Sequence, residues 1–249
     1  MTRKRKPLPE TEFSATVTDL DHDGRGVARV DGKVTFIFGA LPGETVRYKL
    51  QRVTRALDEA VATAIDVPSP DRVTPGCAHF GTCGGCSLQH LAPAAQVAFK
   101  QQAMLEALRR IGGVTPETVA EPVLGPVWGY RRRARMGVKL VHKKGGVLVG
   151  FRERDANALA VLDRCEVVDP RLGDRLRKIG ALFDTLSIAD QIPQIEVSAS
   201  EHVAVTIRVL TLPSDDDRAK LLAFAAENDF DFYLQPGGPD SLQPLAEAR

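Results

Sequence analysis

Four cysteines set the strongest constraint on how this chain of 249 residues can fold. Three lie within the stretch CAHFGTCGGC and one lies far along the chain; they are Cys77, Cys83, Cys86 and Cys165. A C-x-x-C pair lets two thiolates face one metal ion or cluster, and Gly84 and Gly85 are free to take positive φ angles in that turn. Four thiolates suit either zinc or an iron–sulfur cluster, so the sequence predicts a metal centre joining two distant segments.

A simpler interpretation competes with this one. Cys165 would be a small buried strand residue, and the three local cysteines would bind zinc with His79 or His90. The number of cysteines favours the cluster, because four are the full complement of a 4Fe-4S centre and none is left over. We therefore expect the two histidines not to be ligands. A disulfide framework is not expected, since MTRKRKPLPE lacks the apolar run of a secretory signal and cytosolic thiols stay reduced.

The composition is that of a globular protein of one to two domains, with 43% hydrophobic residues. No stretch approaches the ~20 apolar residues of a membrane span, so a cytoplasmic, monomeric protein without a membrane partner is predicted. The net charge of +1 hides an asymmetry, because nine Lys or Arg and one acid lie between Trp128 and Arg154. A run of this kind is typical of a surface that binds polyanions, although a charge run alone is more often solvated.

The first part of the chain has the pattern of a small β domain. Residues 1–10 form a basic, proline-containing tail that we expect to be flexible. Five short candidate strands follow between residues 13 and 65, separated by the turn signals DHDG, VDGK and LPGE. Strands of this number and length predict a closed barrel of the oligonucleotide-binding (OB) type over residues 11–72. The stretch 67–76 is expected to be a linker.

The remainder predicts a mixed α+β domain. The clearest helix spans 93–113, where apolar residues recur at helical spacing after Pro93. Strands are predicted at 134–141, 146–152 and 158–164, a helix at 170–186, and a hairpin around Ser200. Ser214 and Asp217 have the spacing of a capping box that opens a last helix, and 231–236 reads as a final strand.

Taken in order, these motifs resemble a known family. DHDGRGVARVDGKVTFIFGALPGE precedes CAHFGTCGGCSLQHL, and YRRRARMGV, GFRERD, VLDRCEVVDPRL and DFYLQPGGPD follow. The chain from about residue 11 onward is similar to the N-terminal part of the bacterial 23S rRNA (uracil-C5)-methyltransferases of the RlmD/RumA family, within the RNA m5U methyltransferase superfamily. The cysteine pattern ahead of the arginine-rich stretch is the specific part of the resemblance.

The resemblance implies a domain organisation and a set of cofactors. Residues 11–72 would be a TRAM domain, and 73–92 with 125–249 a central RNA-recognition domain that holds a 4Fe-4S cluster. Residues 93–124 would pack with a C-terminal Rossmann-like domain that binds S-adenosylmethionine, and 23S rRNA would be the substrate. The cluster ligands implied by the family are Cys77, Cys83, Cys86 and Cys165.

The sequence also departs from the family pattern. Pyrimidine C5 is too weak a nucleophile to attack a methyl sulfonium directly, so these enzymes add a cysteine thiolate to C6. If all four cysteines bind the cluster, no catalytic cysteine remains, and the sequence has no Gly-rich turn to cradle the cofactor. We therefore expect the Rossmann-like methyltransferase domain to be absent, no catalytic residue to be present, and the chain alone to be inactive.

RNA contacts are expected from the basic segment around YRRRARMGV. Arginines suit bidentate phosphate contacts and a tyrosine can stack on a base. In a strand, alternation would place Arg132 on the face opposite Arg131 and Arg133. The candidate contacts are Tyr130, Arg131, Arg132, Arg133, Arg135, Lys139, Lys143 and Lys144.

Two other functions compete with this assignment. Radical S-adenosylmethionine methylthiotransferases also combine a cluster with a TRAM domain, but their cluster motif is C-x3-C-x2-C and their TRAM domain follows it. A zinc-stabilised, non-enzymatic RNA- or ribosome-binding module is the alternative kept open. For the cluster we expect a structural role rather than redox sensing, because metal binding that joins distant segments is coupled to folding.

Overall fold

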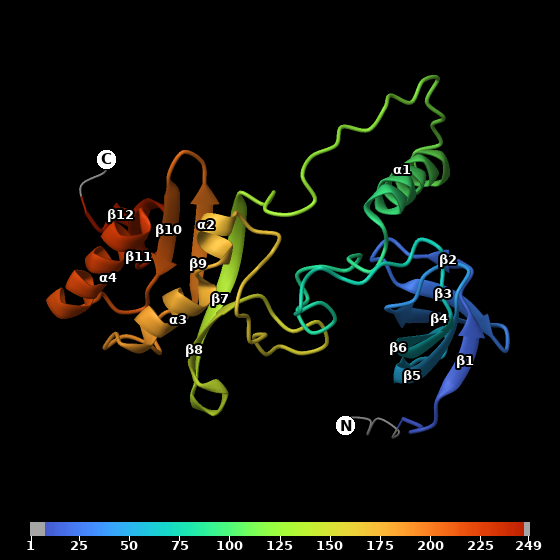
Figure 1. Ribbon diagram of the computed structural model, residues 1–249, viewed down its shortest axis with the longest axis horizontal. Coiled ribbons are helices and arrows are strands. Elements are labelled where there is room, and N and C mark those ends of the chain that lie inside the picture. The colour runs from blue at the N-terminus through green and yellow to red at the C-terminus, as the bar shows by residue number, and fades with distance from the viewer. Residues whose placement is uncertain (1–7, 247–249) are drawn as a thin grey trace. The chain divides into compact units, whose positions relative to one another are not determined.

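The computed structural model of the protein describes residues 8–246 and divides them into two compact units (Figure 1). Unit 1 comprises the described residues up to Gly76 together with Cys86–Val123. Unit 2 comprises Cys77–Gly85 together with the described residues from Leu124 onward. The predicted basic tail falls largely on residues 1–7, which lie outside the described part of the chain.

Unit 1 is built on one six-stranded sheet. Its strands are β1 (Phe13–Thr16), β2 (Asp19–Leu20), β3 (Gly26–Val30), β4 (Lys33–Phe38), β5 (Thr45–Val53) and β6 (Leu57–Val67), in the order β1-β5-β6-β4-β3-β2. Asp31 and Gly32 both have positive φ, 50° and 78°, as a two-residue hairpin turn between β3 and β4 requires. Alternate residues such as Ile37, Val46 and Tyr48 point inward and are fully or almost fully buried.

The expectation of a closed OB-type barrel is wrong. The sheet has an open strand order, with β1 and β2 at opposite edges. The pairing is interrupted between these two short strands, where the chain changes partner: the N–H of Val17 donates to the carbonyl of Glu44, and the N–H of Thr18 donates to the carbonyl of Val27. Two short strands therefore stand where a closed barrel would have one continuous strand.

The predicted linker is held to unit 1 by a buried ion pair. Glu44 is fully buried, and its carboxylate accepts hydrogen bonds from Arg72 Nε at 2.5 Å and Nη2 at 2.7 Å. The backbone N–H groups of Leu41 and Ser69 donate to the same carboxylate. Burial by itself would raise the pKa of Glu44, but the hydrogen bonds from Arg72, Ser69 and Leu41 together bring it below its usual value.

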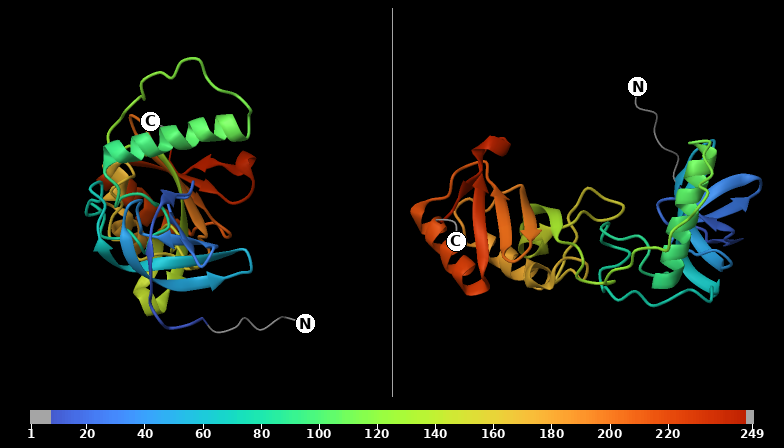
Figure 2. Two further views of the ribbon diagram at one scale, coloured as in Figure 1. Left: turned by 90° about the vertical axis from the view of Figure 1, so that its right-hand side faces the viewer. Right: turned by 90° about the horizontal axis from the view of Figure 1, so that it is seen from above.

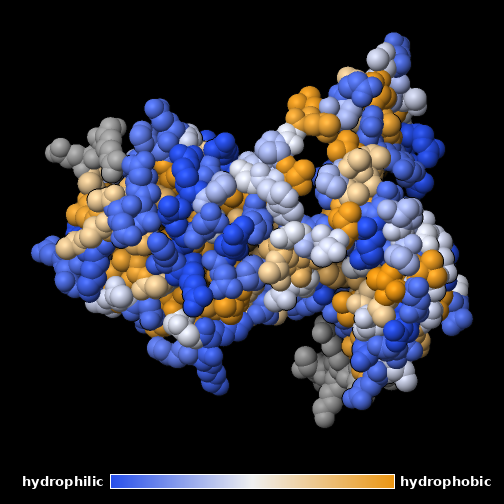
Figure 3. All heavy atoms as spheres, viewed as in Figure 1, coloured by the Kyte–Doolittle hydropathy of each residue, from blue (hydrophilic) through white to orange (hydrophobic). Residues whose placement is uncertain are grey.

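Helix α1 (Pro93–Arg110) follows this linker in unit 1 and ends earlier than the sequence pattern predicts. Proline occupies its first turn, and Ala95 and Phe99 pack on a small cluster of Leu20, Leu41 and Leu91. Beyond this contact the helix continues as a straight rod with no fully buried residue (Figure 2). Apolar side chains remain exposed on α1 and along the extended stretch that follows it (Figure 3). That residues 93–124 pack against a methyltransferase domain stays a prediction.

Unit 2 contains a second six-stranded sheet with helices on one face. Its elements are β7 (Arg133–Val141), η1 (His142–Lys144), β8 (Gly146–Gly150), α2 (Pro170–Gly173), α3 (Leu176–Asp184), β9 (Gln194–Ala199), β10 (Val203–Arg208), α4 (Asp215–Asn228), β11 (Phe230–Gln235), η2 (Pro239–Ser241) and β12 (Gln243–Pro244). The strand order is β12-β11-β10-β9-β7-β8, and α4 connects the parallel pair β10 and β11. Apolar residues of α3, α4 and the sheet form a single core.

The sequence predicts this unit well in its second half and poorly around residues 158–186. The capping box is present, since Ser214 Oγ accepts from the N–H of Asp217 and the Asp217 carboxylate accepts from the N–H of Ser214. No strand forms at 158–164, where only Leu159 makes an isolated bridge, to Arg152. The predicted helix at 170–186 is two helices, because the backbone of Arg175, with φ −114° and ψ 2°, breaks the helical path.

Replacing Glu44 with Gln should destabilise unit 1 by about 3 to 5 kcal/mol, because the Arg72 guanidinium would lose its buried counter-charge. Since the pKa of Glu44 is lowered in the folded protein, the stabilisation is present above the unfolded-state pKa and is lost as the pH falls through the folded-state pKa. Urea unfolding at pH 7 and at acidic pH measures both effects. The exposed Glu10→Gln variant is the control, and equal stability of both variants at pH 7 would contradict the assignment.

Candidate metal centre and nucleic-acid interface

The cysteine loop 77–85 packs closely against the chain that follows β8. The N–H of Gly84 donates to the carbonyl of Arg152, and the N–H of Arg154 donates to the carbonyl of Thr82. A Cβ on Gly84 would lie 3.1 Å from the Arg152 oxygen and 3.2 Å from the Arg154 Cα, so a side chain there would displace backbone. Gly84 and Gly85 do not take the positive φ angles expected of them; within this loop Gly81 has that conformation, at 91°.

The segment around Cys165 is positioned by helix α2. The N–H of Cys165 donates to the carbonyl of Gly173 at 3.1 Å. A Cβ on Gly173 would overlap the carbonyl oxygen of Cys165, which explains why glycine ends this short helix. His79 links the two cysteine segments, because its Nε2 accepts a hydrogen bond from the N–H of Asp163 at 3.2 Å.

All four cysteines are half-buried. Cys77, Cys83 and Cys165 lie in unit 2, and Cys86 is the residue at which the chain returns to unit 1. The N–H of Gly85 donates to Cys83 Sγ at 3.4 Å. Elsewhere in the described chain, the ligand atoms of Asp21, His22 and Asp23 lie within 4.8 Å of one another, on exposed or half-buried side chains.

The histidines differ in their surroundings. His90 lies in unit 1 and is 2% exposed, and its pKa falls to about 4 because burial and the nearby Arg72 guanidinium oppose protonation. His79 lies in the cysteine loop and binds backbone, as described above. No pattern in the sequence signals the hydrogen bond of His79, because the partner N–H belongs to Asp163, far along the chain.

Asp169 joins the start of β7 to helix α2. It is 3% exposed, it accepts from Arg132 Nη1 at 2.5 Å, and it also accepts from the backbone N–H and the guanidinium of Arg171. The hydrogen bond from the Arg171 side chain, above all, lowers the pKa of Asp169. Arg171 in turn donates to the carbonyls of Ser200 and Glu201 in the turn between β9 and β10. This network was not predicted from the sequence.

The predicted RNA contacts divide into several environments. Arg132 is paired with Asp169, whereas Arg133 and Arg135 lie on the opposite face of β7 with Lys139 and are exposed. Arg131 makes backbone bonds to the segment around Val168. The other candidates lie before or after the strand and are exposed: Tyr130, Lys143 and Lys144.

Two of these basic residues bind acids on neighbouring segments. Arg135 Nε lies 2.9 Å from a carboxylate oxygen of Glu196, and Lys144 Nζ lies 2.7 Å from one of Glu153. The Arg135 pair is open to solvent, with side-chain exposures of 70% and 45%, so it contributes little to stability. A phosphate could displace its carboxylate at small cost.

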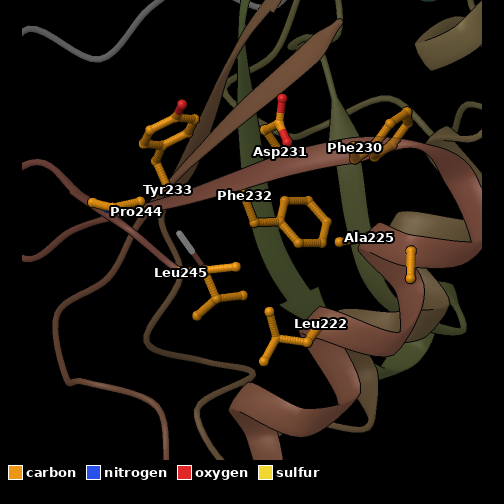
Figure 4. Close-up of a pocket in the computed structure, with 10 residues that line it drawn as sticks. Leu222, Ala225, Phe230, Asp231, Phe232, Tyr233, Pro244 and Leu245 are labelled. Carbon is orange, nitrogen blue, oxygen red and sulfur yellow. The ribbon is translucent and has the colours of Figure 1, made fainter. Parts of the chain in front are cut away.

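A small apolar hollow lies between α4 and β11, with a volume of about 170 Å³ (Figure 4). Leu222, Phe232 and Leu245 line it. Sites for cofactors and other small molecules usually enclose about 300 to 1,000 Å³ and contain several convergent polar groups. The lining also includes Asp231 and Tyr233, but the volume lies below the range of a nucleoside site.

Comparison with known proteins is consistent across nearly the whole chain. The TRAM domain family matches residues 10–62. A protein of Alkalilimnicola ehrlichii named 23S rRNA (uracil(1939)-C(5))-methyltransferase RlmD is 46% identical over 97% of this chain. Proteins of the same name from Xanthomonas axonopodis pv. citri and Alcanivorax borkumensis are 47% and 48% identical over 98% of it. This chain is related to the RlmD proteins over nearly its whole length. It spans 55% to 56% of the length of these three relatives.

A solved structure corrects the expected fold class. The Pyrococcus abyssi tRNA (uracil-54, C5)-methyltransferase in complex with S-adenosyl-L-homocysteine aligns with 89% of this chain and 50% of its own, at a TM-score of 0.54 and 22% identity. The expectation of a chain that lacks its methyltransferase part conflicts with this alignment to a methyltransferase fold. That expectation rested on the lack of a spare cysteine and of a Gly-rich turn, and neither feature determines the fold. Among residues 8–246, no helix is long and apolar enough to cross a membrane.

Substituting Gly173 by Ala should destabilise unit 2 by about 1 to 3 kcal/mol, because the added methyl group would push α2 away from the Cys165 carbonyl. Gly238→Ala is the matched control, since a Cβ there would have no neighbour within 4 Å. Chemical unfolding followed by far-UV circular dichroism measures the difference. Equal stability of the two variants would show that α2 does not hold the Cys165 segment in this way.

Proposed function

We propose that this chain recognises RNA for an S-adenosylmethionine-dependent methyltransferase that makes 5-methyluridine in 23S rRNA. The observation that carries the proposal is the identity of 46% to 48% with proteins of that name across 97% to 98% of the chain. The TRAM match and the exposed basic residues of β7 support an RNA-binding role. No observation favours the zinc-stabilised, non-enzymatic module.

The chemistry we propose for the whole protein starts from the weak nucleophilicity of uracil C5. A cysteine thiolate adds to C6, and the resulting enolate attacks the methyl group of S-adenosylmethionine through C5, releasing S-adenosylhomocysteine. Loss of the C5 proton and elimination of the thiolate then restore the double bond. We assign no attacking role to Cys77, Cys83, Cys86 or Cys165, because we propose a different role for these thiolates.

Those four cysteines are proposed to hold a 4Fe-4S cluster. The number of cysteines supports the proposal, because four thiolates are the full complement of a 4Fe-4S centre and the sequence has no other cysteine. The half-burial of the thiols and the N–H of Gly85 on Cys83 Sγ also suit a cluster.

We propose that the cluster is structural. Cys83 and Cys165 belong to segments that are otherwise joined in unit 2 by the hydrogen bond from Asp163 to His79, and shared ligation would add a strong crosslink. Folding and cluster assembly would then be coupled. The basic segment, apart from Arg132, would remain available to RNA.

Methyl transfer is tested with the whole protein, S-adenosylmethionine and a 23S rRNA fragment labelled with tritium at uridine C5. We expect release of tritium in proportion to methyl incorporation, because methylation replaces the C5 hydrogen. Reactions without S-adenosylmethionine are the control. Methyl incorporation without tritium release would exclude C5 as the acceptor, and binding of the fragment without any methylation would leave RNA recognition but remove the proposed reaction.

Cluster binding is tested by anaerobic purification of this chain. We expect a brown protein with broad visible absorbance and about four iron and four sulfide ions per chain. Cys165→Ser should lose most of the iron, whereas His202→Gln, at an exposed position in the turn after β9, should keep it. A colourless protein with stoichiometric zinc, or full iron content in Cys165→Ser, would refute the assignment.

A further inference from the structure

We propose that single-stranded RNA binds across the face of the unit 2 sheet that is turned away from α3 and α4, with Tyr233 stacking on a base. The proposal rests on the function proposed above and adds which surface of the chain holds the substrate. It extends the interface beyond the basic segment to β9, β10 and β11. These strands lie in a part of the sequence that is rich in acidic residues.

The sheet has two chemically different faces. On one face, successive strands contribute apolar residues in register: Met136 of β7 pairs with Ile195 of β9, and Ile207 of β10 pairs with Leu234 of β11. These side chains are fully buried under the helices. Because alternate residues of a strand point to opposite faces, the residues between them form the second face.

The second face is a polar grid that the pairing register defines. One row across this face takes one residue from each of four adjacent strands. In order, they are Arg135 of β7, Glu196 of β9, Thr206 of β10 and Tyr233 of β11. In the next row toward the end of β10, Gln194 pairs with Arg208. All of these residues are half-buried or exposed. Tyr233 points to the side of β11 opposite Phe232 (Figure 4).

The side chains of this polar grid have the chemistry of an RNA-binding surface. A tyrosine ring on an open sheet offers a base-stacking platform, and stacking tolerates any base because every base has a π face. Arg133, Arg135 and Arg208 supply guanidinium groups on the same face, against the two acids Glu196 and Asp231. The exposed pair of Arg135 with Glu196 is weak enough for a phosphate to replace.

The face is also continuous with the basic segment. Arg133 and Arg135 belong both to that segment and to the first strand of the grid. A strand of RNA lying along the phosphate contacts of β7 would therefore reach β10 and β11 by crossing neighbouring strands, about 5 Å apart. Arg208 and Tyr233 would then contact nucleotides that β7 alone could not reach.

The test measures the affinity of the full chain for an unstructured, uridine-containing RNA oligonucleotide. We expect Tyr233→Ala to weaken binding about tenfold and Tyr233→Phe to leave it within about twofold, because phenylalanine retains the stacking ring. Arg208→Glu is compared with Lys178→Glu, which makes the same change of charge on α3, at the opposite face. Arg208→Glu should weaken binding at least fivefold more than Lys178→Glu.

The outcomes separate this inference from the proposed function. If wild-type protein binds the RNA but Tyr233→Ala binds equally well and the two charge reversals have equal effects, the sheet face is excluded and RNA recognition stands. If correctly folded wild-type protein binds no RNA, both proposals fail. Crosslinking of a 4-thiouridine oligonucleotide to a peptide of β11 supports the proposal directly, and crosslinks confined to the helix face would overturn it. Circular dichroism confirms the fold of each variant.

Discussion

The carboxylate of Asp169 is the interaction on which unit 2 depends most. It holds Arg132 at the start of β7 and Arg171 in helix α2, and Arg171 extends the contact to the turn between β9 and β10. The same short helix fixes Cys165 through Gly173. One buried acid thus links the segment of a proposed cluster ligand to Arg132, directly before β7.

This dependence explains why a run of arginines does not act as a uniform surface. Strand alternation separates Arg132 from Arg133 and Arg135, and Asp169 gives the first of these a structural partner. The exposed members lie on a sheet face that also carries residues from three other strands. Charge density along the sequence therefore indicates the presence of a basic surface but not its extent.

The sequence predicted features that depend on local patterns. The strands of unit 1, the Ser214 capping box and the opposite orientation of Arg132 all follow from periodicity or short-range hydrogen bonding. Features that depend on distant contacts were missed. The chain changes partner at Val17, the Arg152 backbone requires Gly84, and pairing register alone brings Tyr233 into line with Arg135. The ligand set of the cysteines came from their count and from family resemblance, and it stays a prediction.

The division of the chain into units has a consequence for how the protein forms during synthesis. The first segment of unit 2, Cys77–Gly85, is separated from the rest of that unit by Cys86–Val123, which belongs to unit 1. All residues of unit 1 can therefore be synthesised before strand β8 and the residues after it. Until those residues are made, the cysteine loop has no surface to pack against. Throughout that interval two thiols of the loop are without the backbone contacts that later shelter them, so oxidation before residue 154 has been added is a hazard specific to this arrangement.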